Sequence, residues 1–138
     1  MQDWPERERY TAEDLLQIIR ILRDRENGCP WDKVQTHASI RKNFLEETCE
    51  ALEAIDADDA AMMREELGDV LFAAVRVAST LERDPEQALH AACEKFIRRF
   101  TAMEQTALAE GRPLETLSKD ELLAGWNAQK RVVPGGEQ

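Results

Sequence analysis

Four acidic residues at matched spacings are the part of this sequence best suited to chemistry. Glu47 and Glu50 lie three residues apart, and Glu66 and Asp69 repeat that spacing after a short intervening segment. Residues three apart lie on one face of a helix. If two helices run antiparallel through the intervening turn, the four carboxylates face one another, and oxygen ligands of this kind suit a hard cation such as Mg²⁺. The spacing therefore indicates a candidate metal site.

Glu47 and Glu66 differ from ordinary surface glutamates in the residues around them. At about 100° per residue, both fall within the apolar arc of their predicted helix, whereas Glu46 and Glu65 turn toward the polar side. A lone carboxylate in an apolar seam is costly unless it is neutralised or binds a cation. Two such glutamates at matching positions therefore indicate a shared ion. The alternative is a pair of solvated acidic helix faces, which are common in acidic chains.

Composition limits the classes of function. The 138 residues are 43% hydrophobic, which predicts one folded domain with a modest core. Lys and Arg number 18 against 28 Asp and Glu, for a formal net charge of −10. This balance argues against a nucleic-acid polymer as partner, because polyanions bind positive surfaces. A small phosphate ligand remains compatible, since a few local cations and metal ions offset the field at a site.

Cysteine usage and hydropathy indicate a compartment. Cys29, Cys49 and Cys93 form no C-x-x-C pair, so neither a disulfide framework nor a zinc ribbon is predicted. The N-terminal segment is too polar for a signal peptide, and no apolar run approaches the roughly twenty residues of a membrane span. We therefore expect a soluble cytoplasmic protein with no membrane partner.

Apolar periodicity predicts an all-α fold, a compact helical bundle of about four main helices plus a short C-terminal helix. The expected helices run from Thr11 to about Glu26, over about 38–56, from a cap at Asp58 or Asp59 to about Glu82, from Asp84 and Pro85 toward Gly111, and from a capping box at Ser118 and Glu121 to a point before Pro134. Residues 1–10 are expected to form a flexible arm, 11–131 a single domain and 132–138 a frayed tail.

The second and third predicted helices carry wide apolar arcs. The residues of the third helix expected to point inward are Leu67, Val70, Leu71, Ala74, Val75, Ala78 and Leu81. Each arc covers about half of the helix circumference, which is more than one narrow seam needs. We therefore predict helix packing between subunits, in a homodimer or a dimer of dimers.

Other candidate chemistry is sparser. Lys95 and Arg99 lie four residues apart on one predicted helical face, where they either grip a phosphate or form a solvated basic edge. Trp126 and Lys130 repeat that spacing in the last helix. Trp31 is expected to anchor its loop on the core. The sequence has no Walker-type glycine loop and no G-x-S-x-G motif, so any catalysis must come from the four acidic residues.

Five segments of the chain form a specific combination. They read N27-G-C-P-W-D-K-V-Q-T36, E46-E-T-C-E50, E65-E-L-G-D-V-L-F72, K95-F-I-R-R-F100 and W126-N-A-Q-K130. Although E-x-x-E alone is a weak signal, the set resembles the MazG-type nucleoside triphosphate pyrophosphohydrolases, within the all-α NTP pyrophosphatase superfamily. The resemblance extends from about Leu15 to Lys130.

The resemblance implies a reaction and a set of site residues. Enzymes of this family bind Mg²⁺, for which Mn²⁺ is expected to substitute, and split NTPs or dNTPs between the α and β phosphates. The products are a nucleoside monophosphate and pyrophosphate, and the implied role is house-cleaning or regulation of the nucleotide pool. The resemblance makes Glu47, Glu50, Glu66 and Asp69 the metal ligands. It makes Glu46 and Glu47 catalytic residues, with Glu46 orienting or deprotonating the attacking water. The implied nucleotide contacts are Lys95, Arg99, Trp126 and Lys130.

Two differences from relatives are visible. Cys93 stands where relatives often carry Asn before E-K-F, a residue suited to a sugar or phosphate contact. Some relatives carry two tandem copies of the domain, whereas this chain carries one. A single copy favours assembly by dimerisation.

Two other functions also use acidic helices. A ferritin-like di-iron bundle places carboxylates on facing helices, but it needs Glu-x-x-His pairs, and E-T-C-E and E-L-G-D contain no histidine. The remaining alternative to an enzyme is a non-catalytic helical interaction or regulatory module with a structural acidic seam. Magnesium binding distinguishes these, since a structural seam should bind the ion weakly or not at all.

Overall fold

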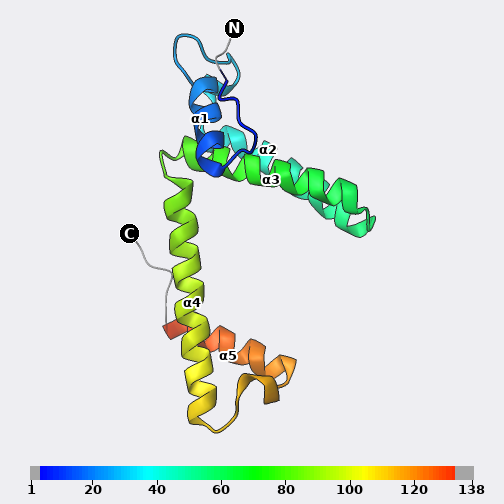
Figure 1. Ribbon diagram of the computed structural model, residues 1–138, viewed down its shortest axis with the longest axis vertical. Helices are drawn as coiled ribbons and strands as arrows, with labels where there is room; N and C mark the ends of the chain where they lie inside the picture. The colour runs from blue at the N-terminus through cyan, green and yellow to red at the C-terminus, as the bar shows by residue number, and fades with distance from the viewer. Residues whose placement is uncertain (1–3, 133–138) are drawn as a thin grey trace. The chain divides into compact units, whose positions relative to one another are not determined.

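The computed structural model describes residues 4–132 of the chain, and in that range all regular structure is helical (Figure 1). The helices are α1 (Ala12–Leu22), α2 (His37–Asp56), α3 (Ala60–Thr80), α4 (Pro85–Ala109) and α5 (Lys119–Val132), with short 3₁₀ helices η1 (Asp32–Val34) and η2 (Leu114–Thr116). The predicted all-α fold is therefore confirmed. None of these helices is long and apolar enough to cross a bilayer.

Contacts group the chain into two compact units, residues 1–86 and 87–138. The first unit contains α1 to α3 and the start of α4, and the second contains the rest of α4 together with α5. The single domain predicted over 11–131 stays a prediction. Within the predicted arm, Arg7 pairs with Asp14 at 3.0 Å. The predicted tail lies outside the described residues except for Val132, which ends α5.

α2 and α3 form an antiparallel hairpin because their caps enforce a tight reversal (Figure 1). α2 begins at a capping box in which Thr36 and Ser39 each bond the other's backbone N–H. After α2, Asp58 adopts a left-handed φ of 52°, which Asp tolerates better than most residues. Asp59 then caps α3 by accepting two N–H groups of its first turn. The hairpin sets the face of α2 that carries Glu47 against α3.

α1 begins at the predicted Thr11 cap but ends at Leu22, short of the predicted Glu26. The Asp24 carboxylate accepts hydrogen bonds from two N–H groups of the following turn. The N–H of Cys29 then bonds to the carbonyl of Leu22. These local bonds compete with further helical bonds and turn the chain back at this point.

The junction after α3 also differs slightly from its predicted position. α3 ends at Thr80 rather than near Glu82, which takes a left-handed φ of 54°. The Asp84 carboxylate accepts the N–H of Glu86, so α4 begins at Pro85 as predicted. Side-chain capping by a residue before proline thus sets the start of the longest helix.

The core of the first unit is small. Its buried hydrophobic residues are Leu16, Ile19, Ile40, Ala54 and Ala73. The residues predicted to point inward on α3 that are instead exposed are Leu67, Leu71, Ala74 and Leu81. The inward prediction is wrong for these four residues in the single chain. Within residues 4–132, α3 makes its substantial contacts with α2 and α1, and its apolar arc is wider than those contacts.

The second unit is held by contacts between α4 and α5. Gly111, with a φ of 69°, ends α4 as predicted. A Cβ on Gly125 would lie 3.3 Å from the Met103 side chain, so glycine lets α5 approach α4 closely. The predicted capping box forms at the start of α5, where the Ser118 N–H and the Arg112 guanidinium donate to Glu121 and lower its pKa from 4.5 to about 2.

Candidate active site

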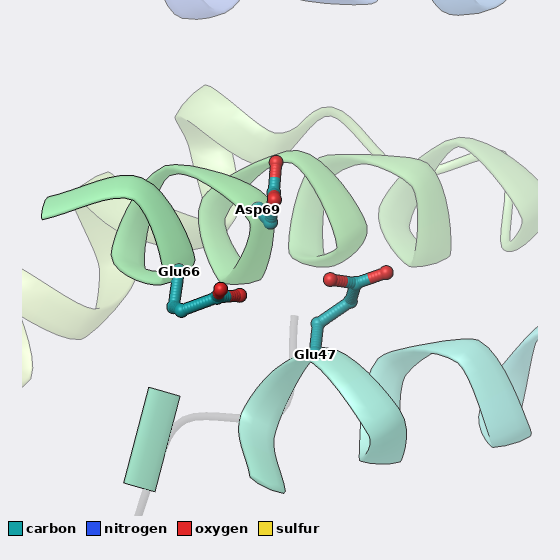
Figure 2. Close-up of side chains that lie close together, drawn as sticks. All are labelled: Glu47, Glu66 and Asp69. Atoms are coloured by element: carbon teal, nitrogen blue, oxygen red, sulfur yellow. The ribbon is translucent and has the colours of Figure 1, made fainter. Parts of the chain in front are cut away.

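Three carboxylates converge between α2 and α3. Glu47 projects from α2, while Glu66 and Asp69 project from α3, and one oxygen of each lies within 4.8 Å of the other two. Figure 2 shows Glu47 and Glu66 extending into the space between the two helices. Glu47 and Glu66 are half-buried and Asp69 is exposed. The hairpin therefore brings together three of the four residues whose spacing predicted a metal site.

The other predicted acidic residues lie around this cluster. Glu50 is exposed and does not belong to the group within 4.8 Å, yet its charge acts on Glu66 strongly enough to shift that residue's pKa. Glu46 is exposed and pairs with Lys42 at 3.4 Å, one turn earlier on α2. Glu46 is thus available to solvent, as its place on the polar side of the helical wheel predicts.

Desolvation and, after it, the crowding of negative charge raise the pKa of Glu66 above its usual value of 4.5. Desolvation is the largest cause, and the charges of Glu50, Glu65, Asp69 and Glu47 add to it in that order. A cation bound among these groups would remove the repulsion that raises this pKa. The cluster thus has the electrostatic character of a site for a cation.

The shift of Glu66 predicts how pH changes the stability of the metal-free protein. An acid whose pKa is raised by folding binds more protons in the folded state, so stability falls as pH rises from about 4.5 through the raised value. Glu66→Gln is therefore expected to raise the melting temperature at pH 7 more than at pH 5. Thermal unfolding in EDTA measures this, with exposed Glu53→Gln as control. An equal gain for Glu66→Gln at both pH values would contradict the assignment.

A network of contacts reaches the cluster through Glu47. The Asn43 amide donates to Glu47 Oε1 at 2.9 Å, and Arg76 Nη1 donates to Asn43 Oδ1 at 3.3 Å. Arg76 Nε lies 3.7 Å from Asp32 Oδ1. The guanidinium Cζ lies 5.6 Å from the Trp31 ring centroid. These contacts connect the segment before α2 to a predicted metal ligand.

The network was not predicted from the sequence. Arg76 does interrupt an apolar run on α3, and Asn43 stands four residues before Glu47, which are the signals that could have found it. Trp31 was expected to anchor on the core, but it is 50% exposed, and the prediction is corrected because the ring lies against Arg76. A hollow of about 280 Å³ adjoins the network, lined by Asn43, Glu47, Asp69, Phe72, Ala73 and Arg76.

The residues predicted to contact a nucleotide all belong to the second unit. Lys95 and Arg99 are half-buried on α4, whereas Lys130 is exposed on α5. The half-buried Trp126 packs against Phe96 with ring centroids 5.2 Å apart and planes tilted by 48°. Trp126, the aromatic residue predicted to contact the nucleotide, thus packs against the residue that follows Lys95.

The three carboxylates fit Mg²⁺ by donor type. Hard oxygen ligands suit this ion, and at about 2.1 Å from the metal two opposite ligands stand about 4.2 Å apart. The three oxygens lie within 4.8 Å of one another. Because at most one pair of three octahedral ligands can be opposite, side-chain rotations would have to bring the other pairs to about 3 Å around one ion. No histidine joins the cluster among residues 4–132, so the donor set differs from that of a ferritin-like di-iron site.

Curated proteins are similar to this chain in sequence. The chain is 39% identical over 120 residues to nucleoside triphosphate pyrophosphohydrolase of Escherichia coli (strain K12), which covers 84% of this chain and 43% of that protein. It is 44% identical over 91 residues to nucleoside triphosphate pyrophosphohydrolase/pyrophosphatase MazG of Thermotoga maritima, which covers 63% of this chain and 35% of that protein. The chain thus spans less than half the length of these curated relatives.

A solved structure supports the same relationship. The crystal structure of a mazG-related protein from Thermotoga maritima superposes with a TM-score of 0.56 at 29% identity, covering 86% of this chain and 98% of that one. Residues 35–103, half of the chain, match the MazG nucleotide pyrophosphohydrolase domain. These residues include α2, α3 and all three converging carboxylates. The chain belongs to the MazG family.

Proposed function

We propose that this protein is a Mg²⁺-dependent nucleoside triphosphate pyrophosphohydrolase. It cleaves NTPs or dNTPs between the α and β phosphates and releases a nucleoside monophosphate and pyrophosphate. The observation that carries this proposal is the convergence of Glu47, Glu66 and Asp69 within 4.8 Å on the hairpin of a MazG-family chain. Relatives named nucleoside triphosphate pyrophosphohydrolase support the substrate class.

The acidic residues would hold the cation. Glu47, Glu66 and Asp69 supply the converging oxygens, and the exposed Glu50, whose charge acts on Glu66, would join them as a fourth ligand. Mg²⁺, or Mn²⁺ in its place, would neutralise the triphosphate and the charge that develops on pyrophosphate as it leaves. The carboxylates themselves form no covalent bond to substrate in this scheme.

The remaining residues act on the water and the nucleotide. Glu46 is exposed and follows Asn43 and Lys42 on the same helix as Glu47, and its carboxylate would orient or deprotonate the attacking water. Lys95 and Arg99 would donate charge-assisted hydrogen bonds to phosphate oxygens. Trp126 would stack on the base, with Lys130 one helical turn further along α5. A net charge of −10 fits a small nucleotide better than a nucleic-acid polymer.

Hydrolysis in ¹⁸O-labelled water tests the position of cleavage. Attack on the γ phosphate would release orthophosphate, and enzymes that do this commonly cradle the β and γ phosphates with a backbone loop that this sequence lacks. An acidic metal cluster suits release of both phosphates as one unit. We therefore expect the label in the nucleoside monophosphate.

The label experiment is best combined with a panel of NTPs and dNTPs and identification of every product by mass spectrometry. Label in pyrophosphate or orthophosphate would show that water attacks elsewhere. A panel without any turnover, together with weak or absent Mg²⁺ binding in calorimetry, would instead favour a non-catalytic interaction module with a structural acidic seam.

The exposed apolar residues of the hairpin support assembly with a second copy. They are Leu45, Leu52, Ile55, Leu67 and Leu71, each at least half exposed. Large apolar side chains concentrated on two neighbouring helices mark an interaction surface. Isologous pairing of the hairpin with itself would cover them in a homodimer or a dimer of dimers. The three cysteines are free, in keeping with a cytoplasmic protein.

A further inference from the structure

Arg76 occupies an unusual environment for a cation on a helix that faces other helices. Its guanidinium lies 4.9 Å from the Phe72 ring centroid and 5.6 Å from that of Trp31, so aromatic rings attract its charge. Its side chain is only 17% exposed, and its Nε atom is buried without a hydrogen-bond partner among residues 4–132. Partial burial of a charge is costly. The cost is consistent with a role beyond packing.

The hydrogen bonds from Arg76 run in one direction. A guanidinium can only donate, so the Asn43 group that faces it at 3.3 Å must be the amide oxygen. The amide nitrogen of Asn43 then faces Glu47, whose ionised carboxylate can only accept, at 2.9 Å. Arg76 therefore selects the amide orientation that hydrogen-bonds Glu47.

Other contacts hold Arg76 in place. Asp32, which is 8% exposed and lies in η1, attracts Nε from 3.7 Å. The carbonyl of Asp32 in turn accepts a hydrogen bond from Arg23 at 3.2 Å. Three parts of the first unit thus meet at this point, since η1, α2 and α3 each contribute a side chain to the network. The Glu47 carboxylate is tied through Asn43 to this framework.

We propose that Asn43 and Arg76 are positioning residues that hold the Glu47 carboxylate in the orientation needed to bind the metal ion. This inference rests on the proposed function, because it assigns Glu47 as a metal ligand. Hydrogen bonds that orient a ligating carboxylate typically change metal affinity by about 10- to 100-fold. Arg76 acts through Asn43, because its guanidinium donates a hydrogen bond to the Asn43 amide oxygen.

The charge of Arg76 makes the test discriminating. A cation near a metal site repels the metal, so removal of Arg76 would tighten binding if charge alone mattered. If Arg76 positions Glu47 through Asn43, its removal would instead weaken metal binding, because the Asn43 amide would be free to turn and the Glu47 carboxylate would lose its orientation. The effect of Arg76→Gln on metal affinity therefore separates the two roles.

The experiment is a double-mutant cycle on metal affinity in the full chain. Mg²⁺ binding is measured by calorimetry and Mn²⁺ binding by electron paramagnetic resonance, for wild type, Asn43→Ala, Arg76→Gln and the double variant. Asn43→Ala is expected to weaken both ions about 10-fold. Arg76→Gln should weaken binding in the wild-type background and not in the Asn43→Ala background.

The matched control is Lys42→Ala. Lys42 contacts Glu46 four residues later on α2, just as Asn43 contacts Glu47, but Glu46 is not in the converging cluster. This variant should keep wild-type metal affinity. Circular dichroism of the metal-free variants confirms folding, and alanine is a good helix former at position 43. If Arg76→Gln does not fold, Asn43→Ala alone decides, because Asn43 makes the direct bond.

Two results would overturn the proposal. One is wild-type metal affinity in Asn43→Ala, and the other is an equal effect of Arg76→Gln in both backgrounds. Failure of the proposed function alone gives a different pattern. A wild-type protein that binds Mn²⁺ but hydrolyses no triphosphate would refute the function, while the double-mutant cycle on metal affinity could still be measured. A wild-type protein that binds neither ion would overturn both.

Discussion

Glu66→Ala is expected to lower kcat/KM for triphosphate hydrolysis on the order of 10³-fold, because a lost metal ligand removes several kcal/mol of charge stabilisation. Glu66 lies within 4.8 Å of both other converging carboxylates, so its loss removes one of the three oxygens that would hold the ion. Glu47→Ala should have a comparable effect for the same reason. Steady-state kinetics with pyrophosphate release as the signal measures both.

The fold should survive these substitutions. Each variant removes a carboxylate from a crowded acidic cluster, so the metal-free helices should be as stable as in wild type or more stable. Glu65→Ala is the matched control, since Glu65 is exposed and points about 100° away from Glu66 around α3. Near wild-type turnover in Glu66→Ala, or an equal loss in Glu65→Ala, would refute the site assignment.

Leu71→Asp is expected to convert the proposed homodimer, or dimer of dimers, to a monomer. Leu71 is 60% exposed in the single chain, so the aspartate should cost the monomer little. At an interface between two copies of the hairpin, the same aspartate would be an unpaired buried charge, which strongly opposes association. Sedimentation or light scattering at micromolar concentration should show a homodimer or larger for wild type and a monomer for the variant.

Val132→Asp provides the comparison for this experiment. Val132 is 75% exposed and ends α5, away in sequence from the hairpin that carries the exposed leucines. Its aspartate adds the same charge and should leave the assembly unchanged. A monomeric wild-type protein at micromolar concentration would contradict the proposed pairing, and a Leu71→Asp protein of wild-type mass would place the interface elsewhere.

Local features of this protein were accessible from the sequence because they depend on neighbours a few residues away. The caps at Thr11, Asp59 and Ser118 and the stop at Gly111 follow from side chains and backbone angles within one turn. The i,i+3 spacing likewise placed Glu66 and Asp69 on one face of α3. Helical periodicity was therefore enough to predict the all-α fold and the acidic face.

Long-range features were decided by the tertiary structure. The hairpin's packing determines that Asp69 joins Glu47 and Glu66 while Glu50 stays outside the group, a choice that spacing alone left open. It also determines which leucines of α3 stay exposed in the part of the chain that the structure describes.

The network around Asn43 and Arg76 shows the physical reason most clearly. Its two residues stand 33 positions apart, and the network includes a tryptophan from yet another segment. A hydrogen bond at 3.3 Å requires two helices to pack at a particular register and rotation, and no local pattern carries that information. Spacing along the sequence could therefore predict the carboxylates proposed to bind a metal, whereas only the packing of the helices could reveal the side chains proposed to hold one of them in place.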